Sequence, residues 1–168
     1  ILDLGKLPPQ AIDIEMDVLG ALMIEPKTIN LISTVLISES FYKESNQVIY
    51  KAIIDLHNSK EPVDYHTIIE KLKSNNDLDL AGGAAYIIGL SSRVGSAAHV
   101  NYHSKIVAEK YMLRELIRMS SEIQDKSFSE TEDITEILNF ANTEIINIQS
   151  TVTGTEISDI SESVTEAM

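Results

Sequence analysis

Two histidines stand at a spacing that metal sites use. His99 and His103 are four residues apart, so both would lie on one face of a helix. A zinc site needs further ligands, and the sequence offers neither a Cys nor an HExxH pattern around this pair. The spacing alone therefore does not predict a zinc site.

Two acids form a second candidate for metal chemistry. Asp13 and Asp17 are one helical turn apart, and carboxylate oxygens are the ligands that Ca²⁺ and Mg²⁺ prefer. Both acids stand near the predicted start of a helix, however, where the positive end of the helix dipole stabilises negative charge without any ion. We therefore expect no metal at this pair.

Gly82 and Gly83 are the residues that come nearest to a phosphate-binding loop. The full GxxxxGK[ST] and GxGxxG patterns are absent from the chain, as is the G-x-S-x-G elbow of serine hydrolases. We interpret the glycine pair as a turn with close backbone packing. The sequence thus predicts no catalytic, cofactor-binding or metal-binding residue, and this chain is expected not to be an enzyme.

The composition is that of a folded protein without thiol chemistry. Of the 168 residues, 43% are hydrophobic, which excludes a disordered chain. The absence of Cys excludes disulfides and thiolate metal sites, and it favours a cytoplasmic location. No apolar run approaches the roughly 18 residues that a membrane span requires, so no membrane partner is expected.

The charge is strongly negative and unevenly distributed. The formal net charge is −13, all 13 Lys and Arg precede residue 127, and nine of the 26 acids follow residue 126. Binding to nucleic-acid phosphates requires clustered bases. The acidic C-terminal part is therefore expected to make little direct contact with DNA.

Apolar periodicity predicts an all-α fold. A series at helical spacing from Ile12 to Met23 predicts a helix that is apolar around most of its circumference and therefore central. Shorter helices are expected over residues 28–36, after a cap at Ser45, and after a cap at Asp64. Together with the segment after Gly83, these helices would form a small globule.

Two long amphipathic segments between Val100 and Ser150 predict an antiparallel helical hairpin, with the chain reversing between Lys126 and Asp133. Each segment carries an apolar stripe at helical spacing. The stripes are Ile106, Leu113, Leu116, Ser120 and Ile123 on the first segment and Ile134, Leu138, Ala141, Ile145 and Ile148 on the second. Further apolar residues lie off these stripes. Two helices alone cannot bury all of them, so we expect the hairpin to have another partner.

Three parts are predicted along the chain: a helical globule over residues 1–98, the hairpin over 99–150, and a short linker helix over 151–168. An apolar series in the last part predicts a one-sided helix that is too short to be stable alone and needs a docking surface. Its members are Ile157, Ile160, Val164 and Met168. The chain lacks an initiator Met and stops within a helical pattern, so we expect a piece of a longer protein.

Four segments of the chain carry a resemblance to a known family. They are PPQAIDIEMDVLGALMIEP, FYKESNQVIYKAIIDLHNSKEPVDYHTIIEKL, LDLAGGAAYIIGLSS and SAAHVNYHSKIVAEKYMLRELI. In this order they resemble the N-terminal domain of bacterial replicative DNA helicases of the DnaB family. The resemblance covers about residues 7 to 150, although the second half of the hairpin matches only in pattern. It departs at Asn46, where the family usually has His, and we expect this change to remove a local hydrogen bond.

The resemblance implies a role in DNA replication through assembly. N-terminal domains of this family form a collar over a ring of six ATPase domains, and their hairpins pair between subunits to give a trimer of dimers. The collar receives the C-terminal helicase-binding domain of primase in the primosome, and the linker helix docks on the ATPase domain of a neighbouring subunit. ATP and Mg²⁺ belong to that ATPase domain, which is missing here, so no cofactor is expected in this fragment.

The resemblance also assigns residues to these roles. Isologous pairing of hairpins would bury the surplus apolar surface. The residues expected at that interface are Ile106, Leu113, Leu116, Ile117, Ile123, Ile134, Leu138 and Ile145. Asp13 and Tyr86 match family positions that modulate primase, and the apolar residues of the linker helix would form its docking face. The alternative is a stand-alone acidic helical adaptor or a helicase-loader-like protein.

Overall fold

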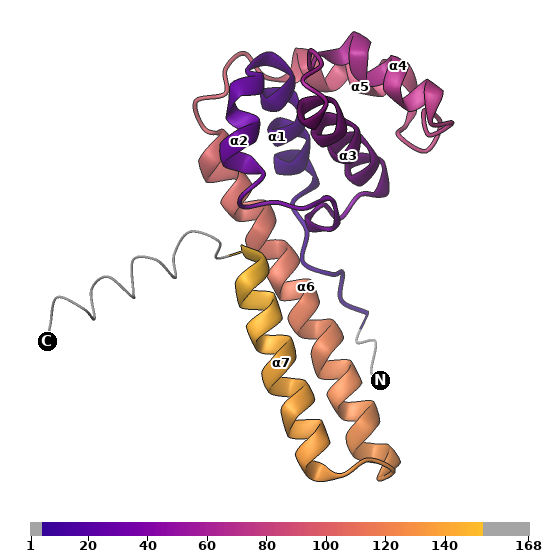
Figure 1. Ribbon diagram of the computed structural model, residues 1–168, viewed down its shortest axis with the longest axis vertical. Helices are drawn as coiled ribbons and strands as arrows, with labels where there is room; N and C mark the ends of the chain where they lie inside the picture. Colours follow the sequence, from indigo (N-terminus) through magenta and orange to yellow (C-terminus); the bar gives the residue numbers. More distant parts are fainter. Residues whose placement is uncertain (1–4, 153–168) are drawn as a thin grey trace, which may run out of the picture. The chain divides into compact units, whose positions relative to one another are not determined.

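The computed structural model describes residues 5–152, and over this range the chain is helical and contains no strand (Figure 1). The predicted all-α fold is therefore confirmed. The helices are α1 (Ile12–Ile24), α2 (Ile29–Ile32), α3 (Glu44–Asn58), α4 (Tyr65–Ser74), α5 (Gly83–Arg93), α6 (Val100–Ser129) and α7 (Ile134–Val152). Short 3-10 turns at Pro26–Thr28 and Ser38–Ser40 precede α2 and α3. The predicted linker residues Ile157, Ile160, Val164 and Met168 lie outside the described residues.

The chain forms two compact units. Among the described residues, the larger unit comprises residues 10–111, with α1 to α5 and the first turns of α6. The smaller unit contains residues 112–152 and residues 5–9. The start of α6 at Val100 agrees with the predicted start of the hairpin. The first turns of that helix nevertheless belong to the larger unit, where Val107 and Ala108 are buried.

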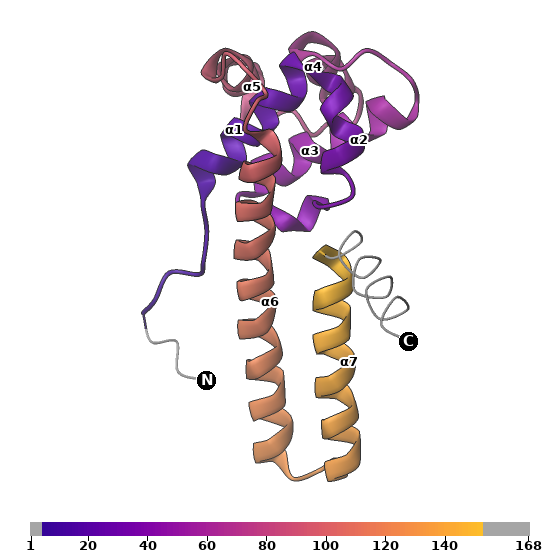
Figure 2. The ribbon, with the colours of Figure 1, turned by 90° about the vertical axis from the view of Figure 1, so that its left-hand side faces the viewer.

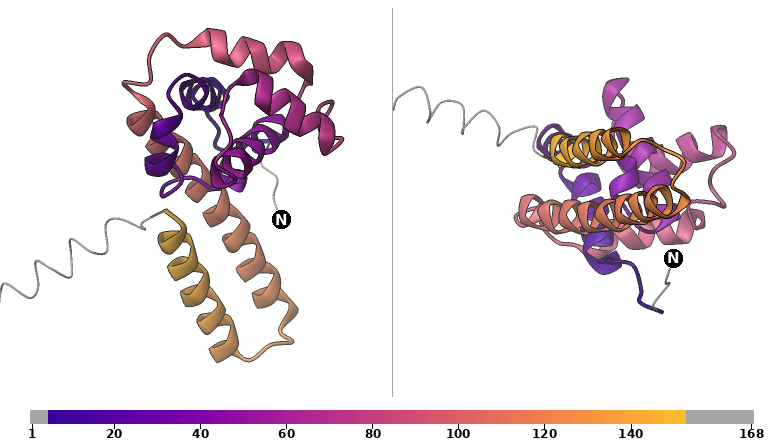
Figure 3. Two further views of the ribbon diagram at one scale, coloured as in Figure 1. Left: turned by 45° about the horizontal axis from the view of Figure 1, so that its top comes forward. Right: turned by 90° about the horizontal axis from the view of Figure 1, so that it is seen from below.

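α1 is the central helix of the larger unit, as its apolar circumference predicts. Val18, Leu19 and Leu22 are completely buried, and α1 lies beside both α3 and α5 (Figure 3). Each such side chain contributes about 1.5–3 kcal/mol when it is fully removed from water. The core continues through Ile53 of α3 and Ile87 of α5, which are also completely buried.

Helix boundaries agree with the sequence where the capping interaction is local. Asp64 caps α4 as predicted, because its side chain accepts a hydrogen bond from the Thr67 backbone N–H at 2.9 Å, three residues on. The helix predicted over residues 28–36 ends at Ile32. Beyond it, the hydroxyls of Ser33 and Thr34 bond to backbone carbonyls three residues earlier and favour a turn.

The predicted cap at Ser45 is wrong. α3 begins one residue earlier, at Glu44, and the cap position is taken by Lys43, whose side chain makes no capping hydrogen bond. Ser45 is buried inside the first turn, and its hydroxyl has no hydrogen-bond partner among the described residues. The acceptor for the backbone at this helix start comes from another part of the chain.

In the smaller unit, α7 runs antiparallel to α6, as predicted for a hairpin (Figure 2). α6 continues to Ser129, so the reversal is limited to residues 130–133, and Glu130 adopts the left-handed conformation with φ 52°. Within the described residues, no helix combines the length and the apolar character that a bilayer crossing needs.

The close approach of α1 and α5 depends on Gly20. A Cβ at this position would lie 2.4 Å from the backbone oxygen of Leu90 and 2.9 Å from a methyl group of Val94. Backbone cannot yield as a flexible side chain can, so only glycine allows this packing distance. Gly89, in the same helix as Leu90, provides the contrast, because a Cβ there would meet no atom within 4 Å.

We therefore predict opposite effects of the same substitution at these two glycines. Gly20→Ala should lower the free energy of unfolding by about 2 kcal/mol or more, because it forces α1 and α5 apart. Gly89→Ala should raise it by about 0.5–1 kcal/mol through helix propensity. Urea denaturation followed by circular dichroism measures both, and equal effects of the two variants would contradict the packing argument.

Candidate functional site

A buried carboxylate joins α1 to the start of α3. Glu15 is 1% exposed, and its Oε1 accepts a hydrogen bond from the Tyr42 backbone N–H at 2.6 Å. Oε2 accepts from the Asn46 side-chain amide at 2.9 Å and, more weakly, from the Lys43 N–H at 3.4 Å. Glu15 thus supplies from α1 the capping acceptor that the α3 start lacks locally, and the positive end of the α3 dipole stabilises its charge.

The same cluster reaches the surface through Tyr86 of α5. Asn46 is completely buried, and its Oδ1 accepts a hydrogen bond from the Tyr86 hydroxyl at 2.7 Å. The Tyr86 side chain is half-buried, and the Lys43 ammonium lies over its ring, 4.2 Å from the centroid. This distance is within the range of a cation–π interaction. Glu15, Asn46 and Tyr86 therefore connect three helices in one hydrogen-bonded series.

A second polar link joins α1 to the other end of α5. The Arg93 guanidinium binds Asp17 at 2.6 Å and Asp13 at 3.2 Å. The hydrogen bond to Asp17 is the main cause that raises the pKa of Arg93. Asp17 is mostly covered, whereas the Asp13 side chain is 85% exposed. Asp13 therefore presents a carboxylate to solvent that Arg93 neutralises only in part.

The residues that suggested metal or phosphate chemistry do not form such sites in the described part of the chain. The rings of His99 and His103 are 6.1 Å apart, and no group of three His, Cys, Asp or Glu is placed to hold an ion there. Gly82 and Gly83 have φ values of 90° and 82° and form the turn into α5, as interpreted from the sequence.

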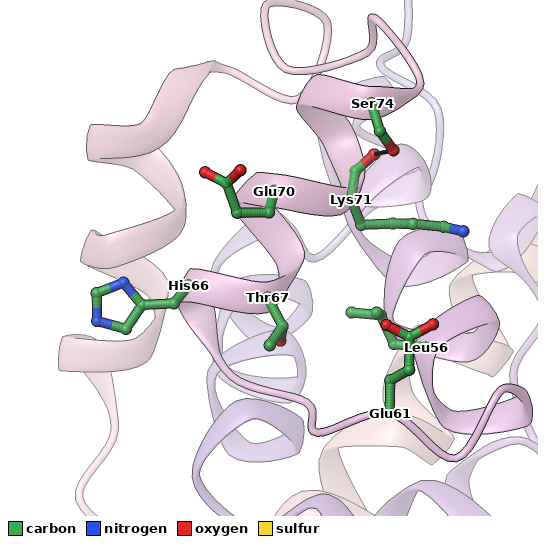
Figure 4. Close-up of a pocket in the computed structure, with 7 residues that line it drawn as sticks. All are labelled: Leu56, Glu61, His66, Thr67, Glu70, Lys71 and Ser74. Atoms are coloured by element: carbon green, nitrogen blue, oxygen red, sulfur yellow. Dashed lines mark hydrogen bonds between the residues drawn. The ribbon is translucent and has the colours of Figure 1, made fainter.

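A shallow groove lies between the end of α3 and α4, and Figure 4 shows its lining. The side chains of His66 and Glu70 point to one side, whereas the Lys71 side chain points to the other. Because its charged groups do not converge on a point, the groove has no evident binding geometry for a small polar ligand.

The hairpin exposes a large amount of apolar surface. Six of the eight residues expected at a subunit interface are exposed, with values between 38% and 66%, whereas Ile106 and Ile123 are half-buried. The six are Leu113, Leu116, Ile117, Ile134, Leu138 and Ile145. The buried residues in this unit are instead Met119, Ile137 and Ile148, two of which lie off the predicted stripes.

Ion pairs connect the two hairpin helices. Arg118 of α6 binds Glu115 and Glu122 on its own helix and Glu144 on α7. The hydrogen bond to Glu144 is the largest cause that raises the pKa of Arg118. Near the reversal, Lys126 pairs with Glu132 at 2.8 Å and lies 5.1 Å from the ring centroid of Phe140. Of these ion pairs, Arg118–Glu144 joins α6 to α7, whereas Lys126–Glu132 joins α6 to the reversal.

The globule and the hairpin together have a known counterpart. Residues 7–109 match the family model described as the DnaB-like helicase N terminal domain. The chain belongs to this family. A solved structure of the N-terminal domain of DnaB helicase from Mycobacterium tuberculosis superimposes with a TM-score of 0.78 and 32% identity, covering 84% of this chain and 99% of that one. The resemblance stated from the sequence is therefore confirmed.

DnaB-like relatives of greater length also match. The chain is 36% identical over 143 residues to the replicative DNA helicase DnaC of Bacillus subtilis, covering 85% of this chain and 32% of the relative. It is 37% identical over 144 residues to the replicative DNA helicase DnaB of Rhodothermus marinus, covering 86% of this chain and 15% of the relative. The chain thus spans a third or less of these relatives.

A further DnaB-like match supports the fold alone. A solved structure of a DnaB-like replicative helicase and its interactions with primase has a TM-score of 0.67 and 24% identity, covering 83% of this chain and 31% of that one.

One expectation drawn from the DnaB resemblance is corrected by the geometry. Asn46, which replaces the usual His, was expected to remove a hydrogen bond. Instead its amide makes two, one to Glu15 and one from Tyr86. An amide has both a donor and an acceptor end, as a neutral imidazole does, so Asn46 can make a hydrogen bond of each kind.

Sequence reasoning missed Glu15, the acid on which this cluster depends. A signal for it was present: Glu15 lies three residues after Ile12 and four before Leu19, on the stripe that helical spacing assigns to the core. An acid on a buried stripe requires donors. Sequence reasoning also left Ile146, which is 61% exposed, out of the expected hairpin interface.

The carboxylate of Glu15 is testable through stability. Glu15→Gln replaces one acceptor oxygen by a donor amide facing the α3 start, so we expect the free energy of unfolding to fall by about 1.5–3 kcal/mol. Glu39→Gln, at an exposed acid, is the matched control and should change it by less than about 0.5 kcal/mol. Urea denaturation at neutral pH measures both, and equal midpoints for the two variants would contradict a buried charged cap.

Proposed function

We propose that this chain is the N-terminal collar domain of a cytoplasmic replicative DNA helicase. Its hairpins pair to assemble subunits, as a trimer of dimers within a hexamer, and its surface docks the C-terminal helicase-binding domain of primase. The domain performs no chemistry. In this proposal ATP, Mg²⁺ and DNA unwinding belong to the ATPase domain of the parent protein, and a linker helix connects the two.

The observation that carries the proposal is the apolar face of the hairpin in a chain that belongs to the DnaB-like family. Leu116 and Ile117 of α6 and Ile134 and Leu138 of α7 are all exposed, although they are large and aliphatic. Exposed apolar patches of this kind mark protein-interaction sites. A second copy of the same hairpin offers a complementary surface, because isologous pairing sets equal patches against each other.

The role in docking primase rests on a different part of the domain. The solved structure with primase interactions shares the fold. In the larger unit, the exposed Asp13 carboxylate and the half-buried Tyr86 ring are the two residues that the family resemblance connects with primase. A carboxylate and an aromatic ring suit a partner that offers a basic group and an apolar side chain.

Charge placed on the hairpin face should prevent self-association. Leu116→Asp or Ile145→Asp would bury an uncompensated carboxylate at the interface, so we expect the dimer dissociation constant to rise at least about 10-fold. Sedimentation equilibrium over a concentration series measures this constant.

Gln124→Asp is the matched control for the hairpin test, because it adds the same charge to an exposed position of α6. It should leave the constant within about twofold of the unsubstituted chain. A strictly monomeric wild-type chain, or equal effects of all three variants, would refute pairing through this face.

The primase contact is tested by neutralising Asp13. Asp13→Asn removes the exposed charge while Arg93 keeps its bond to Asp17, so the fold should persist. We expect affinity for the primase C-terminal domain to fall about 3- to 10-fold, as for the loss of one charged contact. Calorimetric titration measures it, with Glu70→Gln on α4 as an exposed control. Unchanged affinity for Asp13→Asn would remove this residue from the contact.

A further inference from the structure

The side chain of Tyr86 is held at two points. Its hydroxyl donates a hydrogen bond to Asn46 Oδ1 at 2.7 Å, and its ring lies under the Lys43 ammonium at 4.2 Å. Both restraints come from the start of α3, whereas Tyr86 itself lies on α5. The ring is half-buried, so it retains an open part that a partner can touch. The position of that open part is therefore set by α3.

The orientation of the Asn46 amide follows from its neighbours. An ionised carboxylate can only accept hydrogen bonds, so the amide must turn its NH₂ group towards Glu15. The carbonyl end then remains for Tyr86, 2.7 Å from its hydroxyl. Asn46 is completely buried and Glu15 is 1% exposed, so water does not compete for either bond. Glu15 thus determines the orientation of the Asn46 amide, and the amide determines the position of the Tyr86 hydroxyl.

We propose that Glu15 and Asn46 are positioning residues for Tyr86 in primase recognition. Neither residue touches the partner, since both are buried. They act by holding the Tyr86 ring in one place before binding, which lowers the entropy that binding must remove. This inference rests on the proposed function, because it gives Tyr86 a partner, but the placement of the ring is a property of the free chain.

The hydrogen-bonded series from Glu15 through Asn46 to Tyr86, here called the relay, can be tested by measuring affinity for the primase C-terminal domain in single and double variants. Tyr86→Phe removes the donor. Asn46→Leu removes both the acceptor for Tyr86 and the donor to Glu15 while keeping the number and branching of side-chain heavy atoms. Each should weaken binding of the primase C-terminal domain about 3- to 10-fold, the equivalent of one hydrogen bond. The double variant should bind no more weakly than the single variant with the lower affinity, because both changes break the same Tyr86–Asn46 hydrogen bond. Additive losses would overturn the relay.

Asn46→His provides the conservative rescue. An imidazole with one protonated nitrogen can donate to Glu15 and accept from Tyr86, so affinity should stay within about twofold of the unsubstituted chain. A role of Asn46 in packing alone predicts the reverse order, because Leu keeps the branched, four-heavy-atom shape of Asn whereas the imidazole of His is longer. Equal or greater loss with His than with Leu would therefore contradict positioning through hydrogen bonds.

A measurement without the partner separates this inference from the proposed function. In the isotope-labelled chain, the Tyr86 ring should shift the Lys43 ε-methylene proton resonances upfield. Tyr86→Phe and Asn46→Leu should reduce that shift by at least half, whereas Asn46→His should retain it. An unchanged shift in Tyr86→Phe, a variant that removes only a hydroxyl, would overturn the positioning role even if Asn46→Leu fails to fold. If the shift behaves as expected and the unsubstituted chain does not bind the primase domain, the proposed function fails and the placement of Tyr86 by Asn46 stands.

Discussion

The buried carboxylate of Glu15 is the interaction on which the larger unit depends. Removing a charge from water costs several kcal/mol unless donors replace the lost solvent. Here the donors are two backbone N–H groups before α3 and the Asn46 amide, and no ion pair to Glu15 is found among the described residues. The charge is therefore matched by amides and a helix dipole, which act only if α1 and α3 keep their relative placement. A satisfied network of this kind favours one arrangement of helices over its alternatives.

The parts of the fold that sequence could predict are those that local spacing determines. Apolar periodicity located the helices, and Asp64 was recognised as a cap because its partner is three residues away. The start of α3 could not be predicted in the same way, because its capping acceptor, Glu15, comes from 27 residues before Tyr42. The nearby Ser45 was the better local candidate, yet the tertiary contact replaced it. Residue types show that a cap is needed, but only packing decides which side chain provides it.

In the hairpin, too, local spacing predicts the helices but not which of their faces pack together. Each of its helices has more than one apolar stripe, and spacing cannot decide which stripe faces the neighbouring helix. In the structure Met119 and Ile137 are buried, whereas Leu116 and Leu138 on the predicted stripes are exposed. The bond between Arg118 and Glu144 favours this rotation, because it requires that side of α6 to face α7. Most residues of the predicted stripes are thus exposed, although Ile148 is buried and Ile106 and Ile123 are half-buried.

The bases of the hairpin support our proposal that its exposed apolar surface binds protein. From Glu115 to Ser150 the only Lys and Arg are Arg118 and Lys126. Arg118 already contacts three carboxylates, and Lys126 contacts Glu132. A phosphate would have to displace these acids in a region whose excess charge is negative, which opposes binding most strongly at low ionic strength. An apolar protein surface would not have to displace these acids. The exposed leucines and isoleucines of the hairpin take part in none of these ion pairs.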